Sequence, residues 1–148
     1  MEWREERTRA AQEHAAALER RRRTESEAAQ RMLDQFTQAA LAADLPTEVF
    51  VVRGFGGRGR ARTEVEGWLL RRDGTIGLGT DGRMYRLTQD LSLLDRFRTV
   101  SPEAIDPPRV IGAGGRDGDS IALETVLDRL LPGWKDQGQP DAPPPGQG

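Results

Sequence analysis

Residues 63–88 read TEVEGWLLRRDGTIGLGTDGRMYRLT, and this stretch decides the fold class. Runs of β-branched, aromatic and aliphatic residues are interrupted there by Asp73-Gly74 and Asp81-Gly82. An Asp-Gly pair between two such runs is a strong signal for a hairpin closed by a two-residue turn. The stretch therefore predicts an antiparallel meander of three strands, over residues 63–71, 75–79 and 83–88.

Two-residue turns also predict which side chains share a face of the sheet, because side chains alternate along a strand. They place Leu69 opposite Leu78, and Leu78 opposite Tyr85. One face of the predicted sheet is then consistently apolar, with Val65, Leu69, Ile76, Leu78, Tyr85 and Leu87. We expect a helix to pack on this face.

The opposite face of the predicted meander lacks side chains at its centre, at Gly77 and Gly79. Something must cover that strip. An aromatic ring lying over a glycine is a common solution, and Trp68 is the expected cover for Gly79. A ligand or a partner backbone is the alternative, because glycine in a strand can mark a close approach.

The segment before the meander, residues 53–62 (RGFGGRGRAR), holds four arginines, four glycines, one phenylalanine and no acid. It follows a predicted strand over residues 48–52 and is expected to form a loop. Guanidinium groups pair with phosphates and carboxylates, and an aromatic ring can stack on a base. A solvated hairpin loop, a nucleic-acid contact and an acidic protein partner all fit this composition. The candidate binding residues are Arg53, Phe55, Arg58, Arg60, Arg62 and Trp68.

Residues 2–43 contain no glycine or proline and are rich in Ala, Glu, Arg and Gln, which are strong helix formers. They predict a helix from about residue 5 to 44, ended by Pro46. Thr24 and Glu27 fit a capping box, so the helix is either continuous or broken near 22–25. The second half carries the larger apolar side chains and is expected to pack on the domain. The first half has only a weak stripe of Ala11, Ala15 and Leu18, and either projects or pairs with another chain.

Beyond the meander the sequence predicts three short elements. The first is a short helix capped by Asp90, with Leu91, Leu94 and Phe97 on one side, and the second is a strand over 109–111. The third is a core-facing helix that is capped by Asp119 or Ser120 and runs through Leu131. The glycine-rich loop over 112–118 lacks the Lys-Ser/Thr of a phosphate-binding loop, so we read it as a turn.

The predicted fold class is α+β, with a long N-terminal helix, an antiparallel three- to four-stranded β-meander and a C-terminal helix packed on the sheet. The predicted divisions are a charged helical arm over 1–24, an α+β domain over 25–133 and a disordered Pro/Gly-rich tail over 134–148.

Composition weighs against several classes of enzyme. The chain of 148 residues has no cysteine and one histidine, His14, on the charged helix. Thiol chemistry, a catalytic triad and a zinc site are therefore unexpected, and we predict no catalytic residue, metal or cofactor. A net charge of -2 argues against a wholly basic nucleic-acid protein. The N-terminus lacks the apolar core of a signal peptide and no run is long enough to span a membrane, so a cytoplasmic protein without membrane contact is expected.

The block GWLLRRDG at 67–74, the GTDG at 79–82 and the GRDGDSI at 115–121 resemble a group of small uncharacterised actinobacterial proteins. Those proteins share a charged N-terminal helix and a Gly-Arg-rich segment before the Trp-containing strand. The resemblance covers residues 25–131. It implies a bacterial cytoplasmic setting, and it brings no activity, ligand or catalytic residue with it.

The sequence thus predicts a non-catalytic intracellular binding or adaptor protein. The helical arm would mediate self-association or dock an unknown protein partner, and the Arg/Gly segment would make a charged contact. The alternative is an RNA- or DNA-binding accessory protein that uses residues 53–62.

Overall fold

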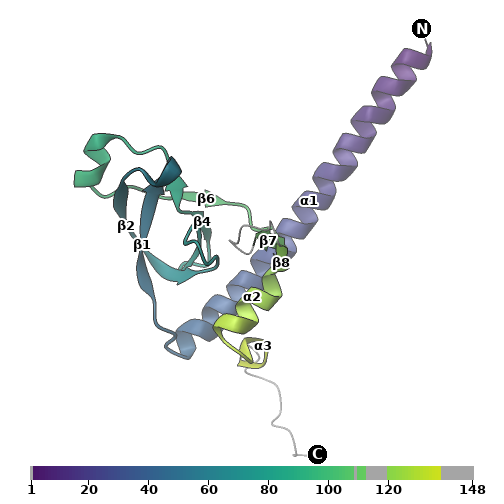
Figure 1. Ribbon diagram of the computed structural model, residues 1–148. Helices are drawn as coiled ribbons and strands as arrows, with labels where there is room; N and C mark the ends of the chain where they lie inside the picture. The colour runs from purple at the N-terminus through teal and green to yellow at the C-terminus, as the bar shows by residue number, and fades with distance from the viewer. Residues whose placement is uncertain (1, 109, 113–119, 138–148) are drawn as a thin grey trace, which may run out of the picture.

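A long helix, a mixed β-sheet and short C-terminal helices make up the computed structural model, which describes residues 2–108, 110–112 and 120–137. Helix α1 (Glu2–Ala42) runs past the sheet and continues well beyond it (Figure 1). The predicted α+β class is confirmed. The sheet is larger than the predicted meander, because segments on both sides of it also pair.

The main sheet has six strands in the order β5-β1-β2-β3-β4-β6. Every neighbouring pair is antiparallel except β1 with β5. The strands are β1 (Glu48–Gly54), β2 (Arg60–Leu69), β3 (Ile76–Gly79), β4 (Met84–Arg86), β5 (Thr88–Gln89) and β6 (Glu103–Ile105). The predicted meander is the β2–β3–β4 part. A separate hairpin pairs β7 (Val110–Gly112), at the predicted short strand, with β8 (Ser120–Ala122).

The predicted register is wrong by one residue in both hairpins of the meander. Trp68, not Leu69, lies opposite Leu78, and Leu78 lies opposite Met84 rather than Tyr85. The β3–β4 connection has three residues, because the Gly79 N–H donates to the Arg83 carbonyl at 2.9 Å. Three-residue hairpins need a left-handed residue at their end, and Gly82 supplies it with φ +84°.

Aspartate side chains stabilise both longer connections. The carboxylate of Asp81 accepts the Arg83 N–H at 2.9 Å. The carboxylate of Asp73 accepts both the Thr75 N–H and the Thr75 hydroxyl, at 3.1 and 2.6 Å. Burial raises the pKa of Asp73, but these bonds and the Arg71 guanidinium outweigh it and hold that pKa below its ordinary value. Each Asp-Gly pair therefore marks a turn, as predicted, but not a two-residue one.

The corrected register gives the sheet two apolar faces instead of one. The face toward α1 carries Trp68, Leu70, Leu78 and Met84. The opposite face carries a smaller buried cluster of Phe50, Val52, Tyr85 and Leu87. The predicted bare strip lies on this second face and is covered, but not by Trp68. A Cβ on Gly77 would lie 2.6 Å from the Phe50 ring, and one on Gly79 would lie 3.0 Å from the Tyr85 ring.

Helix α1 is continuous through the predicted break. Thr24 does not cap a second helix, because its hydroxyl donates to the Arg20 carbonyl one turn earlier at 2.9 Å. The second half of α1 buries a stripe of Ala29, Leu33, Phe36 and Ala40 against the sheet and the C-terminal helices. The Phe36 ring meets Trp68 and Trp134 edge to face, with both centroid distances at 5.8 Å.

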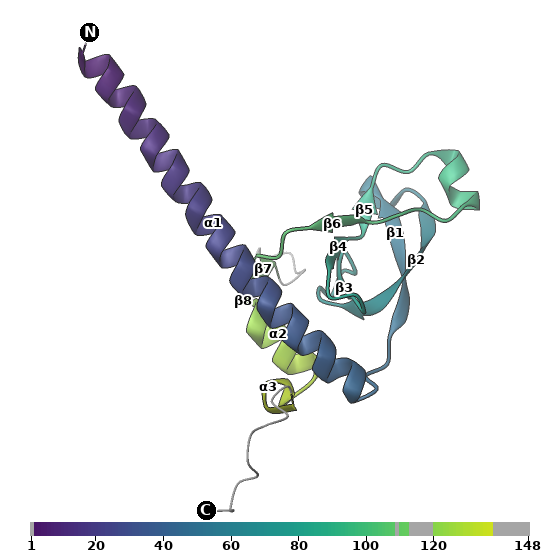
Figure 2. The ribbon, with the colours of Figure 1, turned by 180° about the vertical axis from the view of Figure 1, so that it is seen from behind.

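The first half of α1 is an arm without a packing surface among the described residues. Residues 2–24 are exposed except for the half-buried Ala17. At a rise of about 1.5 Å per residue this arm is about 35 Å long. It projects away from the sheet in both views (Figures 1 and 2). The helix itself does not divide at residue 24; only its packing changes.

The C-terminal segment closes the main core. Helix α2 (Leu123–Leu130) buries Leu123, Val126 and Leu127 in the cluster shared with α1 and the sheet. Its N-cap is Ala122 and not the predicted Asp119 or Ser120, since Ser120 belongs to β8 and Asp119 lies outside the described residues.

The predicted tail begins too early. Residues Trp134–Gln137 form α3, and Trp134 is buried in the core, where its ring nitrogen donates to Asp128 at 2.8 Å. A single large aromatic residue is enough to anchor this turn, although the residues around it are polar. The remainder of the predicted tail, 138–148, is outside the described residues, as are residues 113–119 of the glycine-rich loop.

Candidate binding site at the Arg-rich hairpin

The Arg/Gly segment is the closed end of the β1–β2 hairpin, and most of it is strand. Arg53 lies in β1, and Arg60 and Arg62 lie in β2. Only residues 55–59 connect the strands, and they include a 3-10 turn, η1 (Phe55–Gly57). The segment does join the first strand to the meander as predicted, but it is a short connection rather than a ten-residue flexible loop.

Three arginines share the exposed face of this hairpin. Arg53 lies directly opposite Arg60, and Arg62 lies opposite Val51. All three side chains are exposed, and none forms an ion pair with any residue that the structure describes. Like charges directly opposite each other on neighbouring strands lower stability. This face therefore carries an electrostatic cost that a bound anion would relieve.

The tip of the hairpin presents Phe55 and Arg58, and the Phe55 side chain is 63% exposed. The tip has a defined shape, because Gly54 donates to the Gly59 carbonyl at 3.1 Å. No other residue fits at position 54, where a Cβ would lie 1.8 Å from the Arg58 carbonyl oxygen. An aromatic ring and a guanidinium group are thus displayed next to the arginine face.

Trp68 is not part of this surface. Its side chain is only 3% exposed, it packs edge-on against Phe36, and its ring nitrogen donates to the Leu45 carbonyl at 3.2 Å. It is a core residue that fixes the end of α1 on the sheet. Of the six predicted binding residues, the structure brings together Arg53, Phe55, Arg58, Arg60 and Arg62.

A second surface element lies beside the hairpin, and its place there was not predicted from the sequence. The 3-10 turn η2 (Leu93–Phe97) packs against β2, and the Val100 N–H donates to the Arg62 carbonyl at 2.9 Å. A Cβ on Gly59 would lie 3.2 Å from Nε of Arg96. The guanidinium of Arg96 therefore joins the cationic end of the hairpin.

The predicted helix capped by Asp90 is wrong in its cap. Ser92 caps η2, and Asp95 completes a capping box by accepting the Ser92 N–H at 2.8 Å. Of the three apolar residues predicted on one side of the helix, Leu91 packs on the second core, whereas Leu94 and Phe97 are exposed to solvent. The Ser-x-x-Asp spacing was the readable signal for this start.

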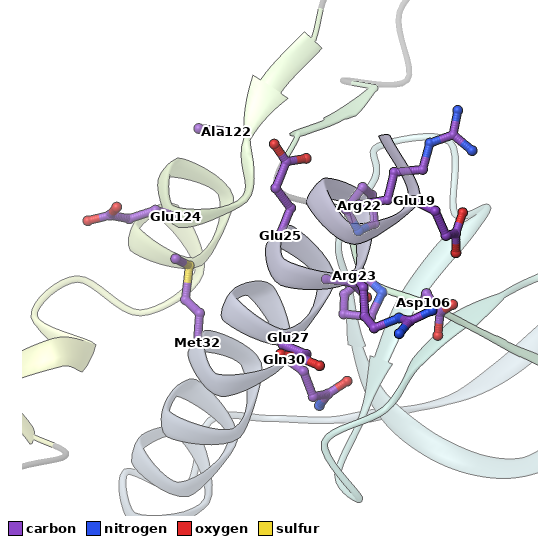
Figure 3. A pocket seen from close by; sticks show the side chains of 13 residues that line it. Glu19, Arg22, Arg23, Glu25, Glu27, Gln30, Met32, Asp106, Ala122 and Glu124 are labelled. Atoms are coloured by element: carbon purple, nitrogen blue, oxygen red, sulfur yellow. The ribbon is translucent and has the colours of Figure 1, made fainter. Parts of the chain in front are cut away.

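A wide hollow of about 1110 Å³ lies at the base of the arm (Figure 3). Between α1 and the segments around 106–108 and 122–124, its lining carries five acids and two bases, which are Glu19, Glu25, Glu27, Asp106, Glu124, Arg22 and Arg23. Among the described residues there is no group of three metal-ligating side chains. The hollow is an open, mixed-charge surface, so the hairpin remains the stronger candidate site.

No protein-family model, no curated protein and no solved structure matches this chain. Within the described ranges, no helix is both long and apolar enough to cross a membrane.

Proposed function

We propose that this protein is a non-catalytic binding or adaptor protein that self-associates through its helical arm and makes a charged contact through the Arg-rich hairpin. The observation that carries the proposal is the arm, residues 2–24, which extends α1 beyond the domain with every residue except Ala17 exposed. Most helical stability in proteins comes from packing of one helix face, and residues 2–24 have no such packing among the described residues. Pairing with another helix would stabilise the arm.

The stripe of Ala11, Ala15 and Leu18 is the surface through which two arms can pair. We take the two arms to run in opposite directions and to cross near residue 13. The same alignment places the small Ala11 opposite Ala15, which lets two helices approach closely.

Single-cysteine variants test this arrangement, because the chain has no cysteine of its own. We expect a mixture of Ala11→Cys and Ala15→Cys to form the mixed disulfide dimer on mild oxidation. Leu18→Cys alone should not cross-link, because two copies of residue 18 would lie about 15 Å apart along an antiparallel pair, beyond disulfide reach. Non-reducing gels and light scattering supply the measurement.

A matched control places the cysteine on the domain, at the exposed Arg129. Efficient cross-linking of Leu18→Cys to a second copy of itself would show that the arms pair in parallel and would contradict the antiparallel arrangement. A wild-type chain that stays monomeric at all concentrations, with no cross-linking at any arm position, would remove self-association from the proposal.

Nucleic acid is the second candidate, favoured by the like-charged pair of Arg53 and Arg60 with Phe55 beside it. If the hairpin contacts about four phosphates of a single strand, affinity should fall about 50-fold between 50 and 200 mM salt. Changing Arg58, Arg60 and Arg62 to Ala should abolish most of that salt dependence. The measurement is a fluorescence anisotropy titration with a labelled oligonucleotide.

The matched control for the hairpin variant removes three exposed arginines elsewhere, with Arg31, Arg83 and Arg129 changed to Ala. It loses the same net charge but leaves the hairpin intact. Equal weakening in both triple variants would mean that only overall charge matters, and the hairpin would not be a nucleic-acid site.

A further inference from the structure

Three large apolar side chains stand in solvent on η2. Leu93 and Leu94 are each 73% exposed, and Phe97 is 88% exposed. We call these three residues the η2 cluster. Burying a side chain of this kind is worth about 1.5–3 kcal/mol, so a fold that leaves three of them together in water forgoes a large stabilisation. Apolar side chains grouped on a surface mark a contact with something outside the chain.

The turn that carries the η2 cluster is held firmly. Ser92 and Asp95 form a reciprocal capping box at the start of η2. The side chain of Arg98, which follows the last residue of η2, donates a hydrogen bond to the Asp95 carboxylate at 2.8 Å. The hydrogen bond from the Val100 N–H to the Arg62 carbonyl then ties the following residues to β2. The exposure of the cluster is thus a fixed feature of the fold, independent of the arm and of its pairing.

The surroundings of the η2 cluster are cationic. Asp95 is turned inward and buried; hydrogen bonds from the Ser92 backbone and the Arg98 side chain keep its pKa below the ordinary value, so the Arg98–Asp95 pair is neutral overall. Arg96 and the hairpin's Arg58 remain exposed next to it. Asp90 is the one exposed acid on the approach to the turn.

The shape of this region suits a fluid surface better than a shaped partner. In both overall views η2 lies at the end of the sheet remote from α1 (Figures 1 and 2). Neither the hollow at the base of the arm nor a smaller one of about 350 Å³ beside β2 includes a residue of η2. A protein partner usually offers or receives a side chain in a pocket, whereas a bilayer interface accepts protruding apolar groups flanked by cations.

We propose that the η2 cluster, with Arg58 and Arg96, is an interfacial contact for an anionic lipid bilayer. Leu93, Leu94 and Phe97 enter the boundary between headgroups and acyl chains, and the two guanidinium groups meet lipid phosphates. The contact is peripheral and needs no membrane-spanning segment. The η2 cluster lies apart from the arm, so a dimer paired through its arms would carry two such contacts.

Co-sedimentation of the full-length protein with vesicles tests this proposal. We expect binding to vesicles of phosphatidylglycerol and phosphatidylcholine in equal parts at 50 mM salt, and at least about tenfold weaker binding to pure phosphatidylcholine. Arg96→Gln should weaken binding to the anionic vesicles about fivefold. The double change of Leu93 and Phe97 to Ser should weaken it at least about tenfold.

Two controls separate insertion from general stickiness and charge. Leu41→Ser removes another exposed apolar side chain, on α1, and Arg83→Gln removes an exposed cation from the β3–β4 turn. Both should bind as the wild type does. Phe97→Trp adds a direct reporter, whose extra fluorescence should shift to the blue only with anionic vesicles.

Several outcomes would overturn the proposal. One is wild-type protein that sediments with neither kind of vesicle, and another is a Leu93/Phe97 variant that still binds as wild type. Vesicle binding that disappears after nuclease treatment would also overturn it, and would assign the cationic surface to nucleic acid instead.

Discussion

Phe36→Ala is expected to lower the free energy of unfolding by about 3–5 kcal/mol. The Phe36 side chain is fully buried and stands between Trp68 on β2 and Trp134 on α3, both at centroid distances of 5.8 Å. It therefore joins the three parts of the main core, which are α1, the sheet and the C-terminal segment. Removing the ring leaves a cavity between these three elements, and the loss is a large fraction of the total stability of a typical domain, about 5–15 kcal/mol.

Urea unfolding followed by tryptophan fluorescence measures this loss, since Trp68 and Trp134 both contact the deleted ring. Gln38→Ala is the matched control, because residue 38 is exposed on the same helix. Alanine is the best helix former, so neither change weakens the helix itself. The free energy of unfolding of the control should therefore lie within about 0.5 kcal/mol of the wild-type value. A loss below about 1 kcal/mol for Phe36→Ala would show that the three parts do not share one core.

The elements with a strong local signal were predictable. The second half of α1 shows helical spacing of its apolar residues, and Ala29, Phe36 and Ala40 are indeed buried. The two Asp-Gly pairs mark the turns of the meander. These signals depend only on neighbouring residues, which a single sequence displays directly.

The register was not predictable from the same pattern, because both faces of the sheet are apolar. Shifting by one residue moves Leu78 from the side of Tyr85 to the side of Trp68, and either side can bury it. The deciding interactions are the Asp81 carboxylate on the Arg83 N–H and the left-handed Gly82. These interactions lengthen the β3–β4 loop from two residues to three, and the pattern of apolar residues alone does not indicate this change.

The candidate site was partly visible for a similar reason. Arg53, Phe55, Arg58, Arg60 and Arg62 lie close together in the sequence, so their clustering needed no tertiary information. The η2 residues come from a segment about 40 positions later, and the pairing of β5 with β1 and the packing of η2 on β2 bring them to the hairpin. Trp68 looked like a surface candidate because an aromatic residue beside glycines does not reveal which face it occupies.

Gly67→Ala is expected to cost about 3 kcal/mol or more of stability, although it adds a single methyl group. In the observed register Gly67 lies opposite Gly79, and a Cβ at position 67 would be 1.9 Å from the Leu78 carbonyl oxygen. That oxygen belongs to the backbone of β3, so no side-chain rotation can relieve the clash. The strands β2 and β3 would have to separate at the centre of the sheet, with both core clusters attached to them.

Two further glycine variants make this expectation specific. Gly79→Ala meets the side chains of Asp81 and Tyr85 at 2.6 and 3.0 Å, which can move, so it should cost less than Gly67→Ala. Gly56→Ala meets nothing within 4 Å but has φ +68°, so only the left-handed backbone conformation is strained, by about 1–2 kcal/mol. Urea unfolding should rank Gly67→Ala as the most damaging of the three. The two-residue turns predicted from the sequence would instead place Gly67 opposite Thr80, and that register predicts no such ranking. Equal losses of stability for Gly67→Ala and Gly79→Ala would therefore contradict the observed register.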